Sequence, residues 1–121
     1  MQENGLPEYR KRKSPDSWDW VDWGVKNTAD KEPIQMAFYY LALSKAKEMA
    51  AVLGNDAHVK WYEERIKTMK PAFEKKYWEE GYYSSNKVKF KDDRANAIAI
   101  VSGIANQEYY NQILNEGNMV V

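Results

Sequence analysis

The chain has no cysteine and a single histidine, His58, among its 121 residues. Without cysteine it has neither a disulfide framework nor a zinc site built from thiolates. One imidazole is too few for a histidine cluster, and the sequence shows no oxygen-ligand loop of the kind that binds calcium. We therefore expect no metal and no cofactor.

Net charge and long apolar runs are also missing. Lysine plus arginine and aspartate plus glutamate number 18 each, so the charge pattern favours neither nucleic acid nor an anionic membrane surface as a partner. No apolar run has the length of a transmembrane helix or the flanks of a signal peptide. Glycine-rich phosphate loops and nucleophile elbows are absent as well, which argues against phosphoryl and acyl transfer.

What the chain does have is aromatic side chains, above all in one short segment. Three of the five tryptophans stand in Trp18-Asp19-Trp20-Val21-Asp22-Trp23-Gly24, together with two aspartates. Indole rings offer flat apolar faces and carboxylates accept paired hydrogen bonds, a combination that suits a sugar. The segment fits equally well with tryptophans that close the end of a helical core and aspartates that cap helices.

A long helix is predicted to follow an N-terminal arm of residues 1–32, which is broken by glycine and proline. Asp30 or Thr28 is the expected N-cap, Pro33 suits the first turn, and Gly54 is the expected residue after the C-cap. Residues 36–43 are apolar or aromatic nearly all round, so we expect this half of the helix to be surrounded, with Tyr39 and Tyr40 in the core.

A second helix is predicted to begin at Asn55 or Asp56, with His58 on its solvent side and without a functional role. Pro71 lies inside this pattern and predicts a kink or a break near Lys70. The charged face, which includes Lys70, is expected to point to solvent. The buried stripe is expected to comprise Val59, Tyr62, Ile66, Met69, Phe73 and Tyr77.

Two shorter helices are predicted to complete the chain, after a turn near residues 79–86 and an extended stretch at 87–91. Asp92 and Asp93 would cap a helix that reaches about Ala105, and a last helix would follow Asn106. The apolar face of the first is expected to comprise Ala97, Ile98, Val101 and Ile104, with small residues such as Ala95, Ala99 and Gly103 allowing close approach. The class is therefore all-α, built from antiparallel hairpins. A tetratricopeptide-like repeat is disfavoured because residues 94–117 do not repeat the spacing of 34–78.

Three strings in the chain resemble the catalytic domain of bacterial α-L-rhamnosidases. They are Trp20-Val21-Asp22-Trp23-Gly24, Ala37-Phe38-Tyr39-Tyr40-Leu41-Ala42-Leu43 and Asp92-Asp93-Arg94-Ala95-Asn96-Ala97. The resemblance implies that the hairpins form part of an (α/α)6 barrel, with the sugar site in loops at one end of its inner helices. It divides the chain into an arm with the tryptophan and aspartate loop (1–32), helical hairpins of a partial catalytic domain (33–117) and a tail (118–121).

The resemblance also implies inverting hydrolysis of a terminal rhamnoside. One carboxylic acid protonates the leaving oxygen while a second carboxylate, roughly 6.5–9.5 Å away, activates water. The segments that bear this pair in the family lie before and after the matched stretch, so no residue here is assigned as acid or base. Met36 stands where the family has a polar residue, so the neighbouring turn receives no binding role.

For the site, the resemblance implies sugar contacts by Trp20, Asp22, Trp23 and Asp19, with Asp92, Asp93 and Arg94 supporting them from behind. A helix cap and an ion pair are the competing interpretation of the last three residues. The isolated chain is expected to be inactive and to self-associate through exposed apolar helix faces. A noncatalytic helical module, either a carbohydrate binder or a repeat-like adaptor, is the alternative. The compartment stays undetermined, with export of a bacterial parent protein compatible with the resemblance.

Overall fold

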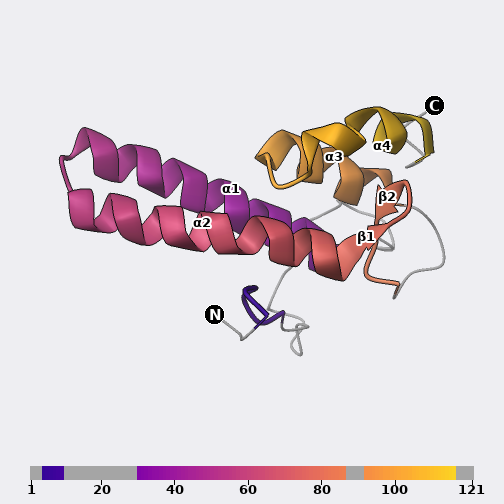
Figure 1. Cartoon of the computed structure of the whole chain (residues 1–121), viewed down its shortest axis with the longest axis horizontal. Coiled ribbons are helices and arrows are strands. Elements are labelled where there is room, and N and C mark those ends of the chain that lie inside the picture. Colours follow the sequence, from indigo (N-terminus) through magenta and orange to yellow (C-terminus); the bar gives the residue numbers. More distant parts are fainter. Residues whose placement is uncertain (1–3, 10–29, 87–91, 117–121) are drawn as a thin grey trace, which may run out of the picture.

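The computed structural model describes residues 4–9, 30–86 and 92–116 of the chain. The element order is α1 (Lys31–Val52), α2 (Asp56–Tyr77), β1 (Trp78–Glu79), β2 (Tyr82–Tyr83), α3 (Asp93–Ser102), the short 3-10 helix η1 (Gln107–Tyr109) and α4 (Tyr110–Glu116). Figure 1 shows α1 and α2 as one long hairpin, with α3 and α4 as a shorter pair beside the end that carries β1 and β2. The predicted all-α class and its two hairpins are confirmed.

The turn between α1 and α2 has the hydrogen bonds of a Schellman motif. The Asn55 N–H donates to the Ala50 carbonyl at 2.9 Å, and the Gly54 N–H donates to the Ala51 carbonyl at 3.1 Å. Gly54 has a φ of 71°, which is a left-handed conformation that a residue with a Cβ rarely adopts. The Asn55 side chain then caps α2 by accepting from the His58 N–H. The predicted end of one helix and start of the next are confirmed.

Helix α2 runs without interruption from Asp56 to Tyr77 although Pro71 lies inside it. The predicted break near Lys70 is therefore wrong. Proline in a helix costs about 3 kcal/mol because it removes a backbone donor and crowds the preceding turn. Met69 and Phe73, on either side of the proline, are fully buried, and each contributes about 1.5–3 kcal/mol by leaving water. Burial on both sides therefore outweighs the local penalty.

Helix α3 lies along α1 and runs in the same direction. Asp30 and Asp92, at the starts of the two helices, are hydrogen-bonded to each other. About three turns further along each helix, Tyr40 and Gly103 come together, since a Cβ on Gly103 would lie 3.8 Å from a ring carbon of Tyr40. Because the two helices are close both at their starts and about three turns further on, the first helices of the hairpins α1–α2 and α3–α4 lie side by side and parallel.

The predicted packing of α3 is confirmed for Ile104, which is buried just after the helix, and for the small residues Ala95 and Ala99, but not for Val101. The predicted face included Val101, but this side chain is 72% exposed. The buried positions within the helix are Ala95, Asn96, Ala99 and Ser102. These small side chains let two helix backbones approach closely, and Val101 lies on the opposite side of the helix because successive residues are about 100° apart.

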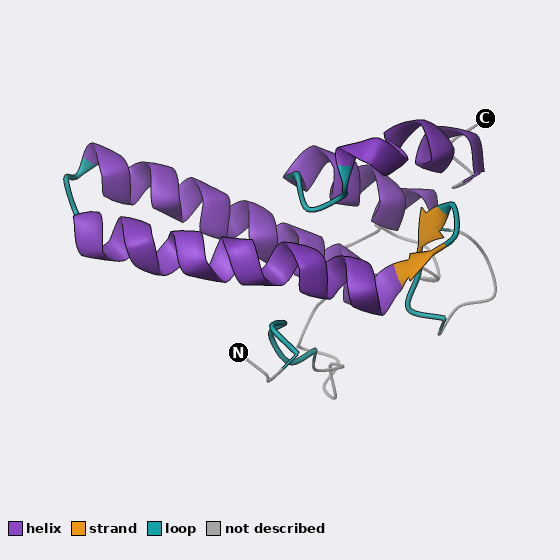
Figure 2. Ribbon diagram, in the orientation of Figure 1, coloured by secondary structure: helices purple, strands orange, loops and turns teal. Residues whose placement is uncertain are grey.

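The main core is formed by α1, α2 and the β1–β2 hairpin, which Figure 2 shows at the end of α2, together with residues of α3, α4 and the N-terminal segment. Its buried members include Met36, Tyr40, Phe73, Tyr77 and Tyr83. The expectation that residues 36–43 are surrounded is only partly met. Tyr40 is in the core as predicted, whereas Phe38 is 51% exposed and Tyr39 is 38% exposed, so one side of α1 is open.

Among the helices of the described residues, none combines the length and the hydropathy needed to cross a bilayer.

Candidate functional site

The starts of α1 and α3 are joined by the carboxylate of Asp92, which is 2% exposed. Its Oδ2 accepts a hydrogen bond from the backbone N–H of Asp30 at 2.6 Å. Its Oδ1 accepts from the backbone N–H and from the Nε–H of Arg94, both at 3.0 Å. Asp92 thus caps α3 and pairs with Arg94, which was the competing interpretation of these residues. The bond to Asp30 was not predicted from the sequence.

Asp30 occupies the N-cap position of α1 but makes no side-chain capping hydrogen bond there. Its carboxylate accepts instead from the backbone N–H of Ser85 at 2.9 Å and from the Ser85 hydroxyl at 2.6 Å. Ser85 belongs to the segment that follows β2. Asp30 and Asp92 together therefore hold three parts of the chain at one point: the start of α1, the start of α3 and the segment after β2.

A third buried carboxylate, Glu32, lies in the first turn of α1. It accepts a hydrogen bond from the Tyr77 hydroxyl at 2.8 Å and forms an ion pair with the Lys76 ammonium at 3.3 Å. Burial raises the pKa of Tyr77 well above its usual value, and the bond to Glu32 raises it further. Glu32 therefore fastens the start of α1 to the end of α2.

Asn96 is a fully buried polar residue that the sequence analysis did not single out. Its side-chain oxygen accepts from the Tyr83 N–H at 2.7 Å, and its amide donates to the carbonyls of Tyr83 at 3.2 Å and Asp92 at 2.9 Å. The side chain therefore pairs with β2 much as a neighbouring strand would. An asparagine set among alanines at helical spacing was the available signal, since such a residue is expected to have buried partners.

The three buried carboxylates described above are suited to holding segments of the protein together and not to proton transfer with a substrate. Asp30, Glu32 and Asp92 are all buried and engaged by donors from the protein, whereas a general acid or base must reach the reacting oxygen. Asp93, which follows Asp92, is exposed. The predicted sugar contacts Asp19, Trp20, Asp22 and Trp23 all lie outside the described residues.

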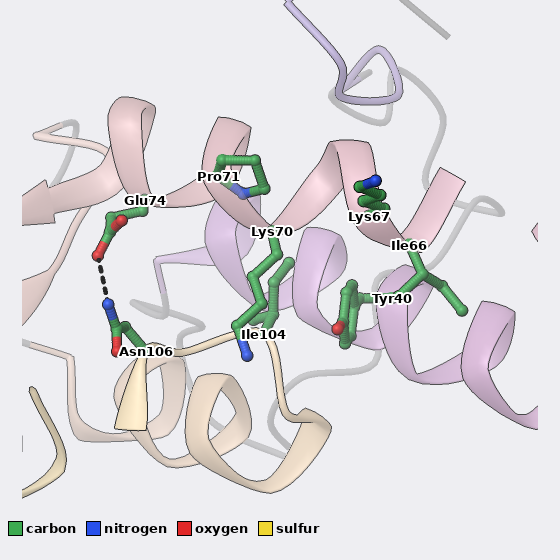
Figure 3. A pocket seen from close by; sticks show the side chains of 8 residues that line it. All are labelled: Tyr40, Ile66, Lys67, Lys70, Pro71, Glu74, Ile104 and Asn106. Atoms are coloured by element: carbon green, nitrogen blue, oxygen red, sulfur yellow. Dashed lines mark hydrogen bonds between the residues drawn. The ribbon is translucent and has the colours of Figure 1, made fainter. Parts of the chain in front are cut away.

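A separate pocket of about 330 Å³ lies between α2 and the turn after α3 (Figure 3). Across it, the Lys70 ammonium donates to the Gly103 carbonyl at 3.1 Å, and the Asn106 amide donates to Glu74 Oε1 at 3.3 Å. Lys70 was predicted to face solvent but is half-buried here. The residues that line the pocket are Tyr40, Ile66, Lys67, Lys70, Pro71, Glu74, Ile104 and Asn106. Glu74 is the one carboxylate in this lining, and inverting glycosidases need two, so the lining does not hold a catalytic pair.

In the part of the chain that the structure describes, no group of three or more metal-ligating side chains is positioned to hold an ion.

Parallel first helices in successive hairpins, with their starts bound together, are characteristic of folds that stack helical hairpins side by side. Residues 2–117 match the family described as bacterial alpha-L-rhamnosidase 6 hairpin glycosidase domain. The chain belongs to this family. This match confirms the predicted resemblance to α-L-rhamnosidases. It also confirms the all-α hairpin fold as part of a six-hairpin domain and the glycoside hydrolase class. No curated protein and no solved structure matches the chain.

Proposed function

We propose that this chain forms part of the sugar-binding wall in an inverting glycosidase of the α-L-rhamnosidase type. The observation that carries the proposal is the 2.6 Å hydrogen bond between the Asp30 N–H and Asp92. It holds the starts of two parallel helices at one end of the molecule. The residues just before the two helices are therefore connected at this same end. In a ring of helical hairpins, the loops at one end of the inner helices form the ligand site.

The sugar contacts in this proposal come from the segment ahead of α1. Trp20 and Trp23 would supply apolar faces for the ring, while Asp22 and Asp19 would accept hydrogen bonds from hydroxyls. Asp92, Asp93 and Arg94 would support the site from behind. The arm and this loop occupy residues 1–32, the hairpins 33–117 and the tail 118–121.

The catalytic acid and base are assigned to parts of the parent domain outside this chain. Asp30, Glu32 and Asp92 are buried and bound by donors, which makes them poor proton donors to a glycosidic oxygen. Glu63 and Glu64 lie exposed on α2, and Glu79 accepts a hydrogen bond from the Asn86 amide at 2.6 Å. The isolated chain is therefore expected to bind a terminal rhamnoside without hydrolysing it.

Tryptophan fluorescence titrated with methyl α-L-rhamnopyranoside tests this function. We expect a saturable change that Trp20→Ala and Asp22→Asn weaken at least tenfold, with unrelated sugars giving weaker responses. Glu63→Gln, which changes an exposed carboxylate on α2, is the matched control and should leave the isotherm unchanged. A flat titration would favour the adaptor alternative. Turnover of a chromogenic rhamnoside by the purified chain would contradict the placement of the acid and base.

A further inference from the structure

A second cavity, of about 230 Å³, lies on the surface of α2 and has no part in the proposed function. It is lined by Trp61, Glu64, Arg65 and Thr68. These residues follow the i, i+3, i+4, i+7 spacing and so share one face of the helix. An exposed aromatic ring, two opposite charges and a hydroxyl therefore line one small hollow.

The indole of Trp61 is exposed and at the same time held in place. It is 46% exposed, while the guanidinium carbon of Arg65 lies 4.0 Å from the ring centroid. The ring of Tyr62 meets the indole edge-on, with centroids 5.1 Å apart and planes at 83°. An aromatic ring fixed in this way loses little freedom when a ligand packs against it, which favours binding.

The polar groups beside the ring have unused hydrogen-bonding capacity. The Nε of Arg65 is buried and has no hydrogen-bond partner in the described parts of the chain. A buried donor without an acceptor is rare in folded proteins and calls for an explanation, of which a bound water, ion or ligand group is one. The Thr68 hydroxyl donates to the Glu64 carbonyl at 2.8 Å, so its oxygen is still available as an acceptor.

The charges at this hollow favour a neutral ligand. Arg65 and Glu64 carry opposite formal charges, so neither an anion nor a cation gains from their sum. A ligand with one apolar face and several hydroxyls matches the ring, the carboxylate and the guanidinium together. We propose that this hollow is an accessory saccharide site, in which the C–H face of a pyranose packs on Trp61 and its hydroxyls bind Glu64 and Arg65.

This site is distinct from the proposed sugar end of the molecule. Tyr77, which binds Glu32 near the start of α1, lies sixteen residues after Trp61 on the same helix, a distance of about 24 Å along the helix axis. In Figure 1 the first half of α2 lies beside the free end of the long hairpin, away from β1 and β2. An accessory site there would hold a second part of a longer glycan, and its existence does not depend on the role of residues 19–23.

The indole N–H signals in a nitrogen–proton correlation spectrum test the proposal, because each of the five tryptophans gives its own signal. The probes are methyl α-L-rhamnopyranoside, methyl α-D-glucopyranoside and sodium sulfate at matched ionic strength. We expect the Trp61 signal to shift saturably with at least one glycoside and not with sulfate. Asp22→Asn should leave this isotherm unchanged, which separates the inference from the proposed function.

Glu64→Gln and Glu63→Gln form the matched pair of variants. Both residues are exposed on α2, but Glu63 pairs with Lys47 at 3.5 Å and does not line the cavity. We expect Glu64→Gln to weaken the Trp61 response about tenfold and Glu63→Gln to leave it unchanged. Circular dichroism is the control that both variants fold like the wild-type chain. A Trp61 signal that neither glycoside moves, or one that sulfate moves as strongly, would overturn the proposal, as would a shift that Asp22→Asn abolishes.

Discussion

The side chain of Asp92 accepts a hydrogen bond from the backbone N–H of Asp30, a residue 62 positions earlier in the chain. Both residues are buried. The bond ties the start of α3 to the start of α1, while the Asp30 carboxylate holds Ser85. One carboxylate pair thus fixes where the connections to two helices begin.

Replacing Asp92 by alanine tests the importance of this bond for stability. The change removes the α3 cap, at a cost of about 1 kcal/mol, and leaves the buried Asp30 N–H without an acceptor, at a further cost of about 1–3 kcal/mol. We expect the free energy of unfolding in urea to fall by about 3 kcal/mol. Asp93→Ala, which alters the exposed neighbour, should cost less than about 1 kcal/mol. Equal losses in the two variants would contradict this role for Asp92.

Asn96→Leu tests whether a polar side chain in α3 holds the β1–β2 hairpin. The variant keeps the branching of the side chain but leaves the buried Tyr83 N–H and two carbonyls without the asparagine amide. We expect a loss of about 2–4 kcal/mol in the free energy of unfolding and a changed near-ultraviolet spectrum of the packed tyrosines. Asn111→Leu, at an exposed position of α4, is the control and should change both little. An unchanged near-ultraviolet spectrum in Asn96→Leu would contradict the role of Asn96 in holding the β1–β2 hairpin.

The protein is expected to lose stability in alkali because of Tyr83. Burial raises the pKa of Tyr83 to about 12, whereas an unfolded tyrosine titrates near 10. Since the folded state binds this proton more tightly, the stabilisation is complete below about pH 10 and is lost as the pH rises through about 12. The difference corresponds to about 3 kcal/mol. Urea unfolding between pH 9 and 12 should therefore show a shallower pH dependence in Tyr83→Phe, and an identical slope would contradict the assignment.

The open sides of α1 and α3 are expected to drive self-association of the isolated chain. Phe38 and Val101 expose apolar surface on these two helices. We expect sedimentation to detect dimers or larger species, and Phe38→Ser combined with Val101→Ser to shift the population toward monomer. Val52→Ser removes an even more exposed apolar residue at the far end of α1 and should have a smaller effect. A wild-type chain that stays monomeric at high concentration would contradict the expectation.

Helix ends were predictable because they depend on short-range chemistry. Gly54 ends a helix through its left-handed conformation, and Asn55 and Asp92 cap the next helices with their own side chains. The stripe of α2 was predictable for the same reason, since its period is a property of the helix. A break at Pro71 was wrongly allowed for because the burial that keeps the helix continuous comes from contacts with other elements.

The sequence by itself determined the family, the all-α class and the order of the helices, because periodicity, caps and motif strings are local in the chain. Only the tertiary structure decided that Val101 is exposed on α3, that Asp30 binds Ser85 in place of capping its own helix, and that Arg65 lies over Trp61. The physical reason is that desolvation and hydrogen-bond satisfaction depend on which distant segments meet. An aspartate just before or at the start of a helix can cap that helix, remain exposed, or be buried and bind a distant segment. Which of these occurs depends on the neighbours that the fold places beside it.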